Sequence, residues 1–377
     1  MRIARIQIFP YALPFTTPFQ TAQMTLQERT GWVVVVEDEA GHTGYGEAAP
    51  LPGFGMEDPG ECEKVLTHWR DNLPGREVNL PAGRGAEALP AFGMANEFPS
   101  ARAARHGLEL ALLDLVSLRK GIPLAKWLHP EALDTVPVNA TLGLASPTET
   151  IDRAQQLMLE GFTTLKIKMD GADSETQISR IKALRQGIGD GIKIRVDANG
   201  SWTEEQALDL LEQLAPLGIE YVEQPLPAKE LKGMARLTQE SPILIAADES
   251  ACSLAQAKRV LEAGAANLII AKPMALGGVL TTLSLVRLAS ETKVPVVITT
   301  TLEGVYARLG AAHCAAAAKP IAGSQLPLYA HGLATGRLLR NDHVPNPPQS
   351  QQGNQKLTAA PGLGANSPEE DHGAGLN

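Results

Sequence analysis

Cysteine is scarce in this chain of 377 residues. The three cysteines, Cys62, Cys252 and Cys314, lie far apart, and none belongs to a Cys-x-x-Cys pair. Neither a disulfide framework nor a zinc site is therefore expected to organise the fold. We expect each thiol to be an ordinary buried or unreactive side chain.

The sequence also lacks blocks of like charge and long apolar runs. Its 33 Lys and Arg residues against 42 Asp and Glu residues give a net charge of −9. A nucleic-acid-binding protein normally carries a basic face, so we expect no nucleic-acid partner. Gly, Pro or charged residues interrupt each apolar stretch well before about 18 residues, so we expect no transmembrane helix and no membrane partner.

Two further signatures are missing. Residues 1–15 alternate apolar and polar side chains and lack the continuous apolar core and small-residue cleavage site of a signal peptide. This pattern predicts a strand and a cytoplasmic protein. No G-x-G-x-x-G follows an expected strand and no G-x-x-x-x-G-K-[ST] occurs, so nucleotide binding has no support.

The first 130 residues combine strand and helix patterns, which predicts an α+β domain. Helical patterns cover residues 58–72 and 100–120, and a stretch rich in Gly, Ala and Pro at residues 80–93 is expected to be a loop. A turn is expected at residues 39–41. The strand-like runs, expected to form a hairpin meander, cover residues 2–9, 32–37 and 45–48.

The middle of the chain alternates short apolar or β-branched runs with helical segments. The runs recur roughly every 25 residues, a spacing that fits the strand, helix and loops of a parallel barrel. They lie at residues 136–142, 164–168, 192–197, 219–223, 243–248, 268–272 and 294–299.

The last part of the chain has a different composition. From residue 341 it is rich in Pro, Gln, Gly and Asn, with one strand-like piece at residues 356–359. We expect the polar stretch at residues 366–377 to be disordered.

Charged residues end several of the apolar runs of the predicted barrel. In a parallel barrel the C-terminal ends of the strands converge on one face, so these side chains should meet around one pocket. Ionised groups at such positions must be solvated, paired or metal-bound. The residues are Lys166, Lys168, Asp197, Glu223, Asp248 and Lys272.

The three carboxylates predict a magnesium site. Asp197, Glu223 and Asp248 would repel one another unless a cation lay among them, and oxygen ligands without His or Cys select Mg²⁺ over Zn²⁺. The alternative is that Asp197 or Asp248 caps the helix that follows it.

The lysines predict an acid–base role. Lys166 and Lys168 are two residues apart on a strand and therefore project to the same face, where mutual repulsion and burial lower the pKa so that one can act as a base. Lys272 would arrive from the opposite side of the barrel. Alternatively, Lys166 or Lys168 forms a structural ion pair with a barrel carboxylate. Arg195 shares the strand face of Asp197, and could reach the pocket or pair with a neighbouring strand-end carboxylate.

Five ordered motifs resemble the signature of the enolase superfamily, muconate-lactonizing subgroup. The resemblance covers residues 1 to about 340 and implies an α/β fold, a (β/α)7β modified TIM barrel at residues 131–340 carrying the catalytic residues. It also implies an α+β capping domain at residues 1–130, and a return to the cap at residues 341–377. The motifs are Lys166-Ile-Lys168, Asp197-Ala-Asn199, Glu223-Gln-Pro225, Asp248-Glu249-Ser250 and Lys272-Pro273.

Within the subgroup, three segments are similar to o-succinylbenzoate synthases. They are Gly-Glu-Ala-Ala-Pro-Leu-Pro-Gly-Phe at residues 46–54, the run at 297–303, which has Thr299 where that family often has Ser, and Pro-Gly-Leu-Gly at 361–364. The first of these also reads as a plain Pro/Gly turn.

This resemblance implies a Mg²⁺-dependent syn dehydration of a cyclohexadiene carboxylic acid to o-succinylbenzoate, in menaquinone and phylloquinone biosynthesis. The substrate carboxylate would bind the Mg²⁺ while Lys168 removes the α-proton and returns it to the departing hydroxide. Lys272 would face the other side of the ring as a cation, and Lys166 and Thr299 would contact the substrate.

Two alternatives are open. The same Lys/Lys/Mg²⁺ site suits an N-succinylamino acid racemase or dipeptide epimerase in which Lys272 returns the proton. A non-catalytic barrel that binds a dicarboxylate is the other alternative. His106, His313 and His331 lie away from the predicted strand ends, and we expect them to be packing or surface residues.

Overall fold

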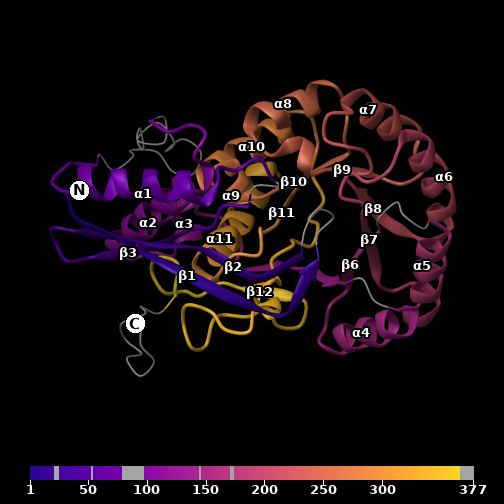
Figure 1. Ribbon diagram of the computed structural model, residues 1–377, viewed down its shortest axis with the longest axis horizontal. Coiled ribbons are helices and arrows are strands. Elements are labelled where there is room, and N and C mark those ends of the chain that lie inside the picture. The colour runs from indigo at the N-terminus through magenta and orange to yellow at the C-terminus, as the bar shows by residue number, and fades with distance from the viewer. Residues whose placement is uncertain (21–24, 52–53, 79–96, 144–145, 170–173, 366–377) are drawn as a thin grey trace.

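The computed structural model of the chain describes residues 1–20, 25–51, 54–78, 97–143, 146–169 and 174–365 (Figure 1). The predicted loop at residues 80–93 and the predicted disordered stretch at 366–377 lie outside these ranges. In the described part of the chain, no helix is long and apolar enough to cross a membrane.

A three-stranded antiparallel sheet forms the N-terminal region. Its strands β1 (Ile3–Gln20), β2 (Thr25–Asp38) and β3 (Thr43–Ala48) pair in that order. The first strand predicted at residues 2–9 is too short, because β1 continues past Pro10 and Pro14. Proline cannot donate to a strand ladder, but β1 is an edge strand, where proline is tolerated.

Two helices pack against this sheet at the predicted positions. α1 (Pro59–Asn72) begins at Asp58, whose side chain accepts a 3.0 Å hydrogen bond from the Glu61 N–H. α2 (Arg102–Lys120) lies so close to β3 that a Cβ atom on Gly46 would be 2.0 Å from the Gly107 carbonyl oxygen. β1–β3 with α1 and α2 are called the cap from here on.

Seven parallel strands form a curled sheet beside the cap within the described residues, in the order β11-β10-β9-β8-β7-β6-β5 (Figure 1). The sheet confirms the predicted α/β barrel class. The predicted limits are met at β6 and β8, whereas β9, β10 and β11 end before the predicted residue. The strands are β5 (Ala140–Leu142), β6 (Thr164–Lys168), β7 (Lys193–Asp197), β8 (Ile219–Glu223), β9 (Ile245–Ala247), β10 (Leu268–Ala271) and β11 (Val296–Ile298).

A segment without an extended ladder joins the two edges of this sheet. His331 and Gly332 form parallel bridges to Val138, just before β5, and to Thr299, just after β11. This eighth position completes the (β/α)7β arrangement. The sequence pattern did not predict this position, because one bridge on each side leaves no strand-length run of apolar residues.

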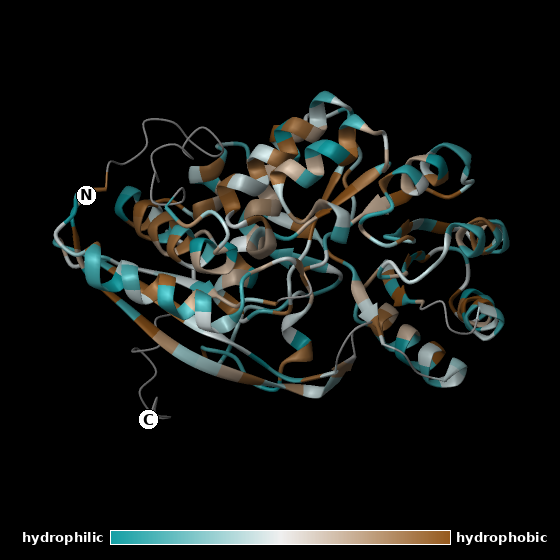
Figure 2. Cartoon of the chain, turned by 45° about the horizontal axis from the view of Figure 1, so that its top comes forward, coloured by the Kyte–Doolittle hydropathy of each residue, from teal (hydrophilic) through white to brown (hydrophobic). Residues whose placement is uncertain are grey.

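Helices surround the curled sheet and show brown, apolar inner faces in Figure 2. In α6, for example, Ala207, Leu210, Leu211 and Leu214 are buried, at the spacing of one helix face. The helices are α4 (Pro147–Leu159), α5 (Ser174–Ile188), α6 (Glu204–Leu214), α7 (Leu231–Glu240), α8 (Leu254–Glu262), α9 (Pro273–Leu276), α10 (Val279–Glu291) and α11 (Val305–Ala322).

The C-terminal segment returns to residues 123–137, between the cap and the barrel strands. β12 (Asn354–Lys356) pairs antiparallel with β4 (Thr135–Pro137), so the run predicted at residues 136–142 divides between β4 and β5. The predicted strand at 356–359 lies two residues too late. Gly362 then pairs with the chain at the start of α3 (Leu124–Leu128), where it accepts a 2.8 Å hydrogen bond from Leu124 N. The predicted domain limits at residues 130 and 340 stay predictions.

Candidate active site

The strand register brings the predicted site residues together. Lys168 is paired in register with Asp197, and Asp197 with Glu223, across β6, β7 and β8. Asp248 follows β9, and Lys272 follows β10. These five side chains, together with Lys166 and Thr299, line one pocket.

Lys166 lies between two of the carboxylates. Its Nζ is 2.8 Å from Asp197 Oδ2 and 2.6 Å from Glu223 Oε1. On the other side of the pocket, Lys272 Nζ contacts Asp248 Oδ1. Lys166 therefore has the ion-pair geometry that was the alternative to an acid–base role. Its position on the pocket lining also allows the predicted contact with the substrate.

The two lysines of β6 differ in their electrostatic surroundings. Burial lowers the pKa of Lys168, and the neighbouring Lys166 lowers it further, against the opposing pull of Asp197. Burial also acts to lower the pKa of Lys166, but the carboxylates of Asp197 and Glu223 outweigh it and hold that pKa well above its usual range. Lys168 is therefore the lysine of this pair whose neutral form is more accessible, as a general base requires.

The carboxylates fit a hard cation by their chemistry. Asp197, Glu223 and Asp248 are 4%, 1% and 3% exposed and offer oxygen donors of the kind that Mg²⁺ prefers. Among the described residues, no group of three His, Cys, Asp or Glu side chains is already arranged around one point. The ammonium groups of Lys166 and Lys272 contact these carboxylates instead, so a bound Mg²⁺ would take over part of that charge compensation.

Neighbouring polar residues fix the carboxylates, and the sequence motifs contain these residues without indicating that role. Asn199 N donates to Asp197 Oδ1 at 3.1 Å, and Asn199 Nδ2 donates to Glu249 Oε1 at 3.1 Å. The Gln224 side chain accepts from Asp248 N at 2.9 Å and holds the chain after β9 against β8. Asn199 and Gln224 have φ of 45° and 40°, so both strand ends adopt the strained left-handed region that is frequent at functional sites.

Thr299, just after β11, lies on the wall of the pocket that residues 299–302 form. Its Oγ1 donates to the Gly332 carbonyl at 3.1 Å, so the hydroxyl proton is used within the protein and the oxygen remains able to accept. The wall continues through Leu302, whose φ of 68° is again left-handed.

The cap and the loop after β3 also contribute to the pocket lining. Phe19 at the end of β1 and Leu51 and Phe54 after β3 line it. Of the predicted loop at residues 46–54, positions 52 and 53 lie outside the described residues. The described part of this loop lines the pocket at the ends of the barrel strands, as expected for part of a capping domain.

The remaining candidates lie away from the pocket. His106, His313 and His331 are buried and bonded to backbone groups, as expected of packing residues. Arg195 is also buried, and pairs with Glu220 near the start of β8 at 2.6 Å. Its partner is therefore neither the substrate pocket nor a strand-end carboxylate, because Arg195 lies one side-chain layer below Asp197 on the same strand face.

Comparison with known proteins decides the family. Residues 149–371 match the family model described as "Enolase C-terminal domain-like". The chain belongs to the enolase superfamily. Residues 1–95 match a second model, "MenC, N-terminal domain".

Curated relatives of several activities resemble this member of the superfamily. The o-succinylbenzoate synthase of Thermosynechococcus vestitus is 32% identical, with 80% of this chain and 86% of that protein covered. The L-Ala-D/L-Glu epimerase of Bacillus subtilis is 31% identical, with 85% and 87% covered.

Solved structures show the same fold. A substrate-liganded complex of the Bacillus subtilis epimerase superposes with a TM-score of 0.87 at 28% identity, covering 97% of this chain and 98% of that one. A dipeptide epimerase from Enterococcus faecalis complexed with Mg and L-Leu-L-Tyr gives a TM-score of 0.86 at 27% identity, covering 97% and 99%.

Proposed function

We propose that this chain is an o-succinylbenzoate synthase, a carbon–oxygen lyase (hydro-lyase). It would dehydrate 2-succinyl-6-hydroxy-2,4-cyclohexadiene-1-carboxylate to 2-succinylbenzoate in menaquinone or phylloquinone biosynthesis. The match of residues 1–95 to the MenC N-terminal domain supports this choice within the superfamily.

The composition of the pocket lining carries the proposal. Asp197, Glu223 and Asp248 are the only carboxylates among the described lining residues, and each of them contacts a lysine ammonium group. An unblocked dipeptide carries a free ammonium group, which would find no spare carboxylate here and would lose its solvation without compensation. A substrate whose second half is neutral or anionic avoids that cost.

The residues of the chain divide the chemistry as follows. Lys168 Nζ takes the proton from the carbon next to the substrate carboxylate, because its lowered pKa makes the neutral amine accessible. When bound by Asp197, Glu223 and Asp248, Mg²⁺ supplies positive charge that stabilises the deprotonated acid. Lys168 then gives the proton to the hydroxyl group that leaves from the same face, so that water departs and the ring becomes aromatic.

Other residues orient and balance the substrate. Lys272 follows β10, which three strands separate from β6, and it faces the substrate from the opposite side as a cation over the developing π system. Lys166 compensates the charge of Asp197 and Glu223, and Thr299 Oγ1 offers an acceptor on the far wall.

An N-succinylamino acid racemase is the second candidate. The two lysines on opposite sides of the pocket favour it, because removal of a proton on one face and return on the other needs such a pair. An N-succinyl group also replaces the free ammonium of an amino acid by a neutral amide.

One experiment separates these candidates. Purified protein with Mg²⁺ is incubated with the cyclohexadiene acid, and separately with an N-succinyl amino acid and with L-Ala-L-Glu in D₂O. Rapid aromatisation supports the synthase. Deuterium exchange with racemisation of the N-succinyl amino acid, without aromatisation, supports the racemase, and epimerisation of the dipeptide contradicts the argument from the pocket lining. The cytoplasmic location and the absence of nucleic-acid and membrane partners stay predictions.

A further inference from the structure

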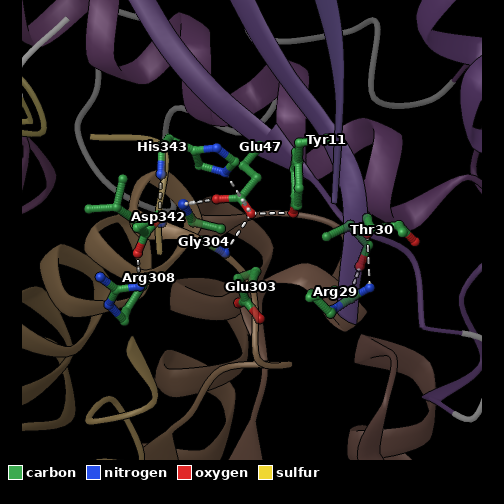
Figure 3. Close-up of polar contacts among 12 residues, drawn as sticks. Tyr11, Arg29, Thr30, Glu47, Glu303, Gly304, Arg308, Asp342 and His343 are labelled. Carbon is green, nitrogen blue, oxygen red and sulfur yellow. Dashed lines mark hydrogen bonds and ion pairs between the residues drawn. The ribbon is translucent and has the colours of Figure 1, made fainter. Parts of the chain in front are cut away.

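Glu47, in the Gly-Glu-Ala-Ala-Pro segment, is an acidic residue with no place in the chemistry above. It is 0% exposed at the end of β3, and its carboxylate points away from the cap toward the barrel (Figure 3). Oε1 accepts from Gly304 N at 2.6 Å and Oε2 from Ala307 N at 3.0 Å, both at the start of α11. A cap carboxylate therefore binds the N-terminus of a barrel helix, where backbone N–H groups lack partners within the helix.

Two more side chains complete this contact. Tyr11 OH, from β1, donates to Glu47 Oε1 at 2.5 Å, and His343 Nε2, from the C-terminal return, lies 3.6 Å from the same oxygen. Burial alone would raise the pKa of Glu47, but these neighbours and the Ala307 N–H lower it to about 2. These contacts favour the charged form of Glu47, which joins the cap, α11 and the return segment.

Glu47 is close in sequence to the roof of the pocket, defined as residues 49–51 and 54. Ala49 N donates to Met274 Sδ at 3.5 Å, two residues after Lys272. Arg29, itself 3% exposed, donates to the Ala49 carbonyl and, at 3.0 Å, to the Pro50 carbonyl. Leu51 follows at once and lines the pocket.

The same contact leads to the wall of the pocket, residues 299–302. Gly304, which Glu47 binds, comes two residues after Leu302. Arg29 Nε donates to the Thr301 carbonyl at 3.1 Å, so one guanidinium group joins roof and wall. The Glu303 carboxylate also accepts from Thr301 N and, at 2.8 Å, from Thr301 Oγ1.

We propose that Glu47 is a positioning residue that fixes the roof of the substrate pocket against its wall. It acts through Gly304 and Arg29 acts in parallel, so that together they set the height of the cap above the lysines. Glu47 and His343 pack tightly against Gly304, because a Cβ atom on Gly304 would lie 3.0 Å from Glu47 Oε1 and 2.4 Å from His343 Nε2. This inference rests on the proposed function only in taking the pocket as the substrate site.

Glu47→Gln tests the proposal. The glutamine keeps the size of the side chain but replaces one acceptor oxygen by an NH₂ group, which faces N–H donors at the start of α11. We expect amide hydrogen exchange at residues 49, 51 and 301–304 to accelerate at least tenfold. We also expect KM for the substrate that the protein turns over to rise about tenfold, with kcat changing less than threefold and Mg²⁺ affinity unchanged.

Asp342→Asn is the matched control. Asp342 accepts from Val305 N at 2.8 Å and pairs with Arg308 at 2.9 Å, so it holds the same helix end from the return segment rather than from the cap. We expect Asp342→Asn to lower Tm about as much as Glu47→Gln does. It should not change KM or the amide exchange at residues 49 and 51.

The proposal is wrong if Glu47→Gln leaves both readouts unchanged, or if Asp342→Asn changes them equally. Should Glu47→Gln fail to fold, Tyr11→Phe removes one bond to Glu47, and smaller changes in the same direction are expected; no change contradicts the proposal. The exchange measurement needs no substrate. Failure of the proposed reaction therefore leaves this inference testable, and failure of this inference leaves the reaction assay intact.

Discussion

Lys272 and Phe54 meet where the barrel faces the cap, with the Lys272 ammonium nitrogen 4.6 Å from the centre of the Phe54 ring. Phe19 has the same relationship to Lys168, at 5.1 Å. Each candidate acid–base lysine therefore lies against an aromatic ring supplied by the cap, and the negative face of the ring stabilises its charged form.

Phe54→Leu should weaken catalysis through Lys272. Leucine keeps an apolar side chain but removes the ring, and a cation–π contact of this kind contributes about 1 kcal/mol. We expect kcat/KM to fall about fivefold in steady-state kinetics. Phe9→Leu, at a 37% exposed position of β1, is the control and should change nothing; equal effects of the two substitutions would contradict the role of the ring.

Lys168→Ala should abolish turnover while leaving the metal site intact. Loss of a positioned general base costs about two to four orders of magnitude in rate. We expect the rate to fall about a thousandfold or more, with Mg²⁺ affinity within about threefold of the wild type by calorimetry. Lys182→Ala, at an exposed position of α5, is the control. Normal turnover by Lys168→Ala would exclude Lys168 as the base.

Mg²⁺ should stabilise the folded protein. A ligand at about a hundred times its Kd adds about 2.7 kcal/mol to the free energy of unfolding. We therefore expect Tm to rise by about 3 °C on addition of Mg²⁺, and a chelator to reverse the rise and abolish turnover. Asp197→Asn should remove most of the shift, whereas Asp190→Asn, at an exposed position, should retain it. An equal shift in both variants would place the ion elsewhere.

Asp114 on α2 should make stability depend on pH. Burial raises its pKa to about 7, although the N–H groups of Tyr45 and Leu363 act in the opposite direction. The folded state therefore binds this proton more tightly than the unfolded chain, in which the pKa is about 3.9. Its contribution to stability is complete below about pH 4 and is lost as the pH rises toward about 7.

Asp114→Asn should remove this loss. Compared at roughly pH 5 and 8 by chemical denaturation, the wild type should lose more free energy of unfolding than the variant, by up to about 1.4 kcal/mol for each pH unit in the window. The constant offset from the lost acceptor oxygen cancels in the difference. Parallel pH profiles would show that Asp114 is ionised throughout.

The barrel and its charged strand ends were predictable from sequence because they are local. An apolar run followed by Lys168, Asp197 or Glu223 marks a strand end by itself, and the parallel topology then brings these residues together. Asp248 and Lys272 were recognised in the same way, although their strands β9 and β10 end one residue before them.

The joins between distant segments were not predictable in this way. The bridges of His331 and Gly332, and the bonds from Glu47 to Gly304 and Ala307, depend on how far two separate parts of the chain approach each other. The periodicity of apolar residues in the sequence does not indicate such contacts. The length of β1 was missed because prolines mark a break in an inner strand but not in an edge strand.

The rings of Phe19 and Phe54 come from the first sixty residues, whereas every lysine and carboxylate they cover comes from positions 166–272. In the proposed reaction, the residues that enclose the substrate and the residues that transfer its proton thus come from separate stretches of the chain. We therefore expect substitutions in the early stretch to change which acid is bound without disturbing proton transfer, provided that the contacts of Glu47 are kept.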